Sequence, residues 1–265
     1  MLIWGAGLQL TQLTPPGLAL RIAPGLRRAG DVVVALLVLS ALAKLPLLAA
    51  SFGDGWTDAG NVEILLRLVA TAPGAVAVIG AQLAVLFVAS WGLGDRPWPA
   101  ATALAGLTLL ACALTGHATE GGLLHQLNDA VHLAASGFWL GALLPLALAM
   151  RQPGDDALIT VRRFAVVGQI AVALTLITGV VNTWLTLGRL PIDPASSYDR
   201  LLGLKLLLVA AMLTLALTNH FRHLPRLRLG GDAAALAIRR GALVEIGLGV
   251  AAVALVALFG MMDPG

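Results

Sequence analysis

Apolar segments about as long as a bilayer is thick recur along this 265-residue chain and limit the folds open to it. Hydrophobic residues make up 58% of the sequence, charged residues only 12%, and the mean hydropathy is +0.90. A soluble domain carries about 25% charged residues, whereas a helix needs about 20 apolar residues to cross the hydrocarbon core. The sequence therefore predicts an all-α, polytopic transmembrane helix bundle, with residues 1–265 forming a single integral-membrane domain.

Seven apolar stretches are long enough to cross a membrane as helices. They cover residues 31–51, 73–93, 99–116, 127–150, 160–187, 200–219 and 235–261. The chain also starts with apolar residues up to Leu10, which Pro15 and Pro16 interrupt. This start is typical of the second half of a transmembrane helix, or of a re-entrant segment. We expect seven full spans plus a partial N-terminal span, which makes eight if the first is complete.

Positive charge alternates between the connections. One set of connections is rich in arginine: Arg21, Arg27, Arg28, Arg96, Arg151, Arg162, Arg163, Arg222, Arg226, Arg228, Arg239 and Arg240. The other set carries only Arg67, Arg189 and Arg200. Positively charged loops stay in the cytoplasm. We therefore expect the N-terminal basic loop to be cytoplasmic and the C-terminus to lie outside.

Three of the five histidines, His117, His125 and His132, lie where a short polar loop enters an apolar segment on the outer side. Ionisable groups are costly in the bilayer, so such a cluster is a functional hypothesis. His125, Asp129 and His132 have the spacing i, i+4 and i+7 and share one helical face. His117 can fold back over that face. Imidazole and carboxylate together predict a transition-metal site. The alternatives are a haem site, a proton relay, or solvated and hydrogen-bonded histidines.

Softer donors for such a metal are Cys112, Met261 and Met262, because thiol and thioether groups favour Cu(I). Three polar residues inside spans, Asn182, Lys205 and Glu245, are further candidates, although structural hydrogen bonds would also explain them. The segment Gly137–Gly141 has small residues four positions apart, which predicts close helix packing. The single cysteine excludes a disulfide within one chain. The chain has no phosphate-cradling Gly-Lys-Ser/Thr loop and no hydrolase motif, so we expect neither an ATP-driven pump nor an enzyme.

The order of the motifs resembles the CopD family of bacterial copper-resistance inner-membrane proteins. Gly116-His117-Ala118 is followed by Asp129-x-x-His132 and by Phe138-Trp139-Leu140-Gly141. Further along come Arg163-Phe164, Thr178-Gly179-Val180-Val181-Asn182, Tyr198-Asp199-Arg200-Leu201-Leu202-x-x-Lys205, Asn219 and Glu245. The resemblance covers most of the chain from about residue 10 onward.

The resemblance implies a multi-pass copper-binding protein of the bacterial inner membrane, with a periplasmic C-terminus. Copper would be accepted on the periplasmic side and moved into the cytoplasm. A periplasmic copper chaperone of the CopC type would be the partner, with membrane lipid around the protein and no nucleic acid. Asp129, Trp139, Asn182, Lys205 and Glu245 would orient the ligands or shape the path. Two alternatives stay open: a haem-binding electron-transfer protein, and a copper-delivery or assembly partner that does not transport.

Overall fold

The structure is a computed structural model that describes residues 1–92, 98–114, 121–152, 154–189, 193 and 195–259. Its elements there are helices, with no strand among the described residues. In chain order they are α1 (Leu2–Leu8), η1 (Gln9–Leu13), α2 (Pro16–Phe52), η2 (Trp56–Asp58), α3 (Val62–Val69), α4 (Ala72–Gly92), α5 (Trp98–Cys112), α6 (Gly122–Ala149), α7 (Asp155–Leu187), α8 (Ser197–Thr218), η4 (Asn219–His223), α9 (Leu224–Arg228) and α10 (Asp232–Phe259). The predicted all-helical bundle is confirmed.

Among the described residues, six helical segments are long and apolar enough to cross a membrane. They are Pro16–Phe52, Pro73–Gly92, Gly122–Ala149, Asp155–Leu187, Ser197–Arg228 and Asp232–Leu258. The span expected at residues 99–116 is represented by α5, which has 15 residues and is about 22 Å long, short of a core of about 30 Å. The expected count of seven or eight spans is therefore not confirmed.

The segment around Arg21, Arg27 and Arg28 differs from the sequence prediction, because it is the first half of the helix α2 and not a loop. Pro16 stands in the first helical turn, where its missing N–H costs nothing. Leucine, alanine and arginine then dominate the segment, and all three are strong helix formers. With 37 residues α2 is about 55 Å long, so its basic half extends beyond the apolar stretch that was expected to span.

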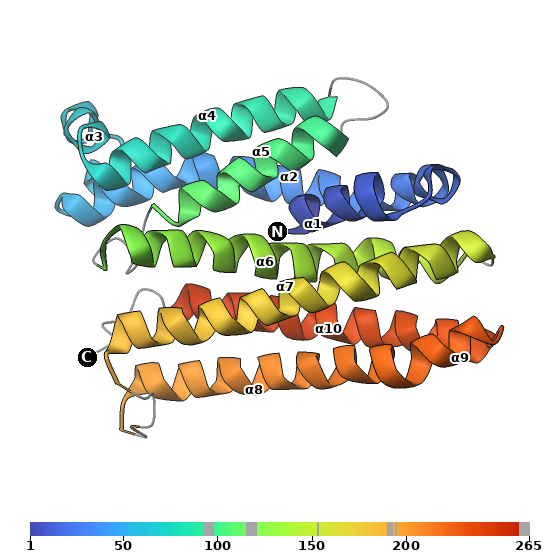
Figure 1. The fold of residues 1–265 in the computed structure, drawn as a ribbon. Coiled ribbons are helices and arrows are strands. Elements are labelled where there is room, and N and C mark those ends of the chain that lie inside the picture. Colours follow the sequence, from blue (N-terminus) through green and yellow to red (C-terminus); the bar gives the residue numbers. More distant parts are fainter. Residues whose placement is uncertain (93–97, 115–120, 153, 190–192, 194, 260–265) are drawn as a thin grey trace.

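The long helices run along one axis, and their connections gather at two ends of the bundle (Figure 1). The turns around η2 and α3 and the start of α8 lie at one end, which we call the open end. The start of α7, the helix α9 and the start of α10 lie at the other end. That end carries Arg151, Arg226 and Arg228, and we call it the basic end. The alternation of loop charge read from the sequence thus corresponds to two opposite ends of the fold.

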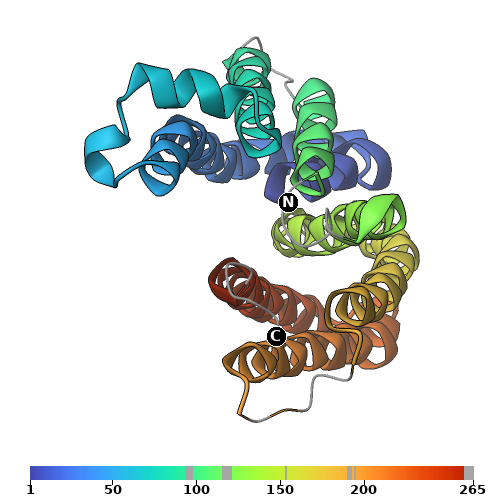
Figure 2. The same cartoon turned by 90° about the vertical axis from the view of Figure 1, so that its left-hand side faces the viewer.

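The helix α6 lies at the centre of the molecule. It packs mainly on α7, α1 and α10, and Figure 2 shows it between the group α1–α5 and the group α7–α10. Of the 18-residue apolar stretch of α6, 56% is buried inside the protein, whereas the corresponding share is 28% or less in the other five candidate spans. Residues on α6 therefore have protein neighbours on most sides, and this helix holds most of the predicted site.

The N-terminal helix α1 packs closely on α6. The helix α1 starts in the middle of the bundle and, with η1, runs to the basic end (Figure 1). A Cβ added at Gly141 would lie 2.9 Å from the Cα atom of Gly5, and one added at Gly5 would lie 2.6 Å from the carbonyl oxygen of Phe138. The indole of Trp4 donates to the carbonyl of Ala134 at 2.9 Å. The close packing predicted for Gly137–Gly141 is confirmed, and α1 is the helix that approaches.

Candidate functional site

Polar side chains of α6 and α7 meet near the open end and form the α6–α7 polar cluster, which comprises Asn128, Asp129, His132, Thr178 and Asn182. The amide of Asn182 donates to the Asp129 carboxylate at 2.9 Å. The amide of Asn128 donates to Asn182 at 2.6 Å and to the Thr178 carbonyl at 2.9 Å. The hydrogen bonds hold the carboxylate of α6 against the facing turn of α7.

His132 is oriented by a hydroxyl group. Its Nδ1 lies 3.0 Å from Oγ1 of Thr178, and that hydroxyl donates its own proton to the Leu174 carbonyl at 2.5 Å. Because the hydroxyl proton is committed, Oγ1 accepts from the imidazole, and Nδ1 carries the proton of the neutral ring. Nε2 is then the nitrogen with the free lone pair, which is the form that binds a metal. Gly179 makes room for the ring, since a Cβ there would lie 3.3 Å from Cε1 of His132.

His125 is one turn before Asp129 on the same helix, as the sequence predicted. Its side chain is 3% exposed and folds over Gly121, and its buried Nδ1 has no hydrogen-bond partner among the described residues. His117 lies outside the described residues. Within the part of the chain that is described, no three His, Cys, Asp or Glu side chains stand close enough to hold a metal ion. The described donors His125, Asp129 and His132 are spread over two turns of α6.

The remaining predicted site residues fall at different places. Lys205 of α8 is near enough to Asp129 for their charges to interact. Cys112 is exposed at the end of α5, near enough to Asp129 for the carboxylate to disfavour ionisation of the thiol. Met261 and Met262 lie outside the described residues. Near the open end, Asp129, His132, Asn182 and Lys205 are thus neighbours.

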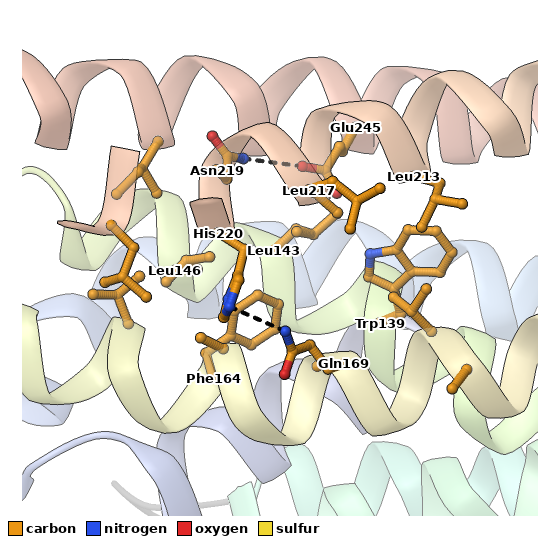
Figure 3. A pocket seen from close by; sticks show the side chains of 18 of the residues that line it. Trp139, Leu143, Leu146, Phe164, Gln169, Leu213, Leu217, Asn219, His220 and Glu245 are labelled. Carbon is orange, nitrogen blue, oxygen red and sulfur yellow. Dashed lines mark hydrogen bonds between the residues drawn. The ribbon is translucent and has the colours of Figure 1, made fainter. Parts of the chain in front are cut away.

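Trp139 and Glu245 lie deeper, in a cavity of about 250 Å³ between α6, α7, α8 with η4, and α10 (Figure 3). Glu245 is 2% exposed and accepts a hydrogen bond of 3.2 Å from the amide of Asn219. Trp139 lies within reach of the same carboxyl group. Across the cavity, Gln169 and His220 are hydrogen bonded at 3.2 Å. The residues predicted to shape one path therefore lie in two places. Asp129, Asn182 and Lys205 are near the open end, whereas Trp139 and Glu245 are in the cavity.

Sequence reasoning missed Asn128 and Thr178 as site residues, and also the pair of Gln169 and His220. Asn128 and Gln169 were detectable as amides inside apolar stretches. Thr178 was named only as the first residue of the motif Thr178–Asn182 and not as a site residue, because threonine is common in membrane helices and usually bonds to its own backbone.

An ion pair fixes the loop before α8. Asp199 is 4% exposed and accepts from Nη1 of Arg189 at 2.6 Å, from Nη2 at 3.3 Å and from the backbone N–H of Asp193 at 2.9 Å. The hydrogen bond to this carboxylate raises the pKa of Arg189 above its ordinary value, so the guanidinium stays charged. Ser196 caps the helix by accepting from the N–H of Asp199. These contacts set where α8 begins, and with it the position of Lys205.

Two family models match the chain in sequence. The model described as copper resistance protein D-like, N-terminal domain, matches residues 1–126, and the model described as copper resistance protein D matches residues 158–259. The chain belongs to the copper resistance protein D family. Residues 127–157, which include Asp129, His132 and Trp139, lie between the two matched ranges.

Three relatives are similar to the chain in sequence. The inner membrane protein YebZ of Escherichia coli (strain K12) is 28% identical over 100% of this chain and 94% of its own length. Copper resistance protein D of Pseudomonas syringae pv. tomato is 33% identical over 61% of this chain and 57% of its own. Copper transport protein CutJ of Bacillus subtilis (strain 168) is 33% identical over 56% of this chain and 31% of its own. No solved structure matches the chain. The family and these names support a multi-pass inner-membrane protein connected with copper.

Proposed function

We propose that this protein binds copper near the open end of the bundle and passes it inward along α6. His132 and Asp129 receive the ion, and His117 and His125 are the further ligands. The observation that supports this proposal most directly is the orientation of His132. Its Nδ1 donates to Thr178, which leaves the lone pair of Nε2 available to a metal. A metal-binding imidazole commonly bonds through its other nitrogen in this way. Membership in the copper resistance protein D family supports copper as the cargo.

The proposed path inward runs from the α6–α7 polar cluster to the cavity that contains Trp139 and Glu245. Trp139 follows His132 by two turns of α6, or about 10 Å. Glu245 lies beside Trp139 and is the next carboxyl group along this route. Asn182 holds Asp129, and Lys205 adds a positive charge next to the same carboxylate. Cys112, Met261 and Met262 are the candidate soft ligands for Cu(I).

Orientation follows from the arginines. Because positively charged loops stay in the cytoplasm, the basic end is the cytoplasmic end, and the N-terminal basic half of α2 and the start of α10 face inward. The open end and the C-terminus then face the periplasm. A periplasmic chaperone of the CopC type is the partner that delivers copper there.

Copper uptake into sealed vesicles that contain the purified protein tests this function. We expect the double variant His117→Ala/His132→Ala to lose both copper binding and uptake. His223→Ala is the matched control, because this histidine lies at the basic end and outside the cavity. Unchanged binding and uptake in the double variant would refute the site assignment.

Two further outcomes of the same preparation separate the alternatives. Copper binding without flux would identify a delivery or assembly partner instead of a transporter. A Soret band at stoichiometric intensity would identify a haem protein, an alternative that neither the matched families nor the named relatives support.

A further inference from the structure

We infer that the cavity between α7 and α8 is a binding site for a membrane-soluble ligand whose ring-sized head carries hydrogen-bonding oxygen atoms, the chemistry of a quinone or quinol. The cavity measures about 250 Å³ and is lined by residues of α6, α7, α10 and the continuous segment from α8 to α9. It shares Trp139 and Glu245 with the proposed copper path. The inference does not depend on copper, because it rests on the shape and lining of this cavity.

The cavity lies beside the bilayer. The helix α7 packs mainly on α6, and α8 packs mainly on α10. The walls formed by α7 and α8 therefore stand on a floor of α6 and α10, as Figure 3 shows for Gln169 on one side and Leu217 on the other. Leu217 is 45% exposed, and Gln169 is exposed as well, although both line the cavity. A ligand dissolved in the membrane can therefore enter between these two helices.

The polar groups of the cavity are few and converge from three elements. Apolar side chains such as Leu143, Phe164 and Val172 cover most of the wall. Against them stand the carboxyl group of Glu245, the amides of Asn219 and Gln169, and the imidazole of His220. Small-molecule sites have this composition, with a mainly apolar wall and a few placed polar groups.

A π-helical turn brings two of these groups into the cavity together. Asn219 and His220 are the first two residues of the π-helical turn η4 (Asn219–His223), and both line the cavity. Such turns are rare and occur frequently at functional sites. On α10, Gly241 leaves space for Asn219, since a Cβ there would lie 2.7 Å from the Asn219 amide nitrogen. The local backbone is thus arranged to present both polar groups.

One nitrogen of the His220 ring is left without a partner. Nε2 is bonded to Gln169 at 3.2 Å, whereas Nδ1 is buried and has no hydrogen-bond partner among the described residues. A buried polar atom that lacks a partner is unfavourable, and native proteins rarely keep one without a reason. An oxygen atom of a ligand head would supply this partner, and Gln169, which is also a donor, lies next to it.

The same lining disfavours two other occupants. A hydrocarbon chain of a phospholipid would place methylene groups against Glu245 and Asn219 and would leave His220 unpaired. A bare metal ion would face a wall made mostly of carbon, and a metal site needs several donors around the ion. A compact head with oxygen atoms satisfies the polar groups, while its ring packs against Trp139 and Phe164.

Photolabelling of the protein in lipid nanodiscs tests the inference. The probe is an azido-substituted benzoquinone with a decyl chain, and unlabelled decylubiquinone is the competitor. We expect competitor-sensitive label in residues 155–187 and 197–228. Gly168→Leu fills the cavity, since a Cβ at Gly168 already lies 3.3 Å from the Phe164 ring. The variant should lose most of the competitor-sensitive label. Gly203→Leu in α8 is the matched control, because nothing lies within 4 Å of its added Cβ.

A second variant covers the case in which Gly168→Leu does not fold. Gln169→Leu removes a polar group from an exposed position of a membrane helix, so its fold should persist. Losing one hydrogen bond to the ligand should raise the half-saturating competitor concentration by about threefold to tenfold. Both variants should bind copper as the unmodified protein does.

Three results would overturn the inference. The first is label in α7 and α8 that decylubiquinone does not displace. The second is labelling that Gly168→Leu and Gln169→Leu leave unchanged. The third is displacement by phosphatidylglycerol but not by decylubiquinone, which would identify the cavity as a lipid-chain site. Loss of copper binding in His117→Ala/His132→Ala with intact photolabelling would support both proposals, and intact copper binding there would refute only the copper site.

Discussion

Single polar side chains decide the chemistry at the open end, because each one is held by a neighbour on another helix. Thr178 accepts from His132 and donates to its own backbone, so one hydroxyl group selects the tautomer of the imidazole. Among the described residues, the hydrogen-bond donor to the Asp129 carboxylate is Asn182. The sequence suggested that Asp129 would orient an imidazole. For His132 the hydrogen-bond partner is Thr178, and the role expected of Asp129 toward an imidazole stays a prediction.

Thr178→Val should weaken copper binding, because valine keeps the shape of threonine but cannot accept the hydrogen bond of His132. Loss of such an orienting partner lowers metal affinity by about 10- to 100-fold. Equilibrium copper titration of the purified variant measures the change. Thr214→Val is the control, because its hydroxyl bonds only to the Ala210 carbonyl of its own exposed helix face, at 2.8 Å. Equal affinities for the two variants would show that Thr178 does not orient a ligand.

At the scale of helices, glycine contacts place α6 at the centre. Gly5 and Gly141 let the backbones of α1 and α6 approach each other, and the indole of Trp4 bonds across the same interface. Close approach of backbones through small residues is a main source of helix association in membranes, where lipid tails are as apolar as the side chains. The position of α6 in turn determines where His132 and Trp139 stand.

Gly141→Leu should separate α1 from α6. The new side chain would collide with the backbone of Met1 and Gly5, and overpacking of this kind costs about 1–3 kcal/mol or more. Thermal unfolding in detergent, followed by the loss of helical signal, measures the destabilisation. Gly80→Leu in α4 serves as the control, since nothing lies within 4 Å of its added Cβ. An unchanged unfolding midpoint for Gly141→Leu would mean that this contact does not hold the two helices together.

For the whole molecule, the separation of charge between the two ends is the dominant feature. The arginines of α9 and of the start of α10 gather at the basic end, whereas the α6–α7 polar cluster lies toward the open end. The proposed entry of copper from the periplasm depends on this orientation in the membrane.

Cysteine labelling tests the orientation in a Cys112→Ala background. Trp56 is 76% exposed at the open end, and Leu229 is 88% exposed at the basic end. A membrane-impermeant maleimide should label Trp56→Cys in intact spheroplasts, and should label Leu229→Cys only after the membrane is permeabilised. The reverse pattern would place the α6–α7 polar cluster on the cytoplasmic side and would contradict periplasmic entry.

The positions of the apolar helices could be predicted from the sequence, whereas the extent of α2 and the contacts between helices could not. The apolar stretches at 73–93, 127–150 and 160–187 correspond to helices α4, α6 and α7, because length and hydropathy are properties of the local sequence. The basic first half of α2 was wrongly expected to be a loop, because arginine marks a membrane boundary without ending a helix. The predicted face of His125, Asp129 and His132 exists on α6, whereas the partners of these residues on α7 were not foreseen.

The sequence by itself determined that the chain is a helical membrane protein, which ends carry the arginines, and which stretch contains the histidines. Only the tertiary structure decided that Thr178 orients His132, that Glu245 meets Asn219, and that a cavity lies between α7 and α8. The physical reason is that membrane helices are apolar on nearly every face, so hydrophobic periodicity does not mark the faces that meet. Helix partners are chosen by small residues and by polar contacts between distant segments, and those become visible only when the helices are packed together.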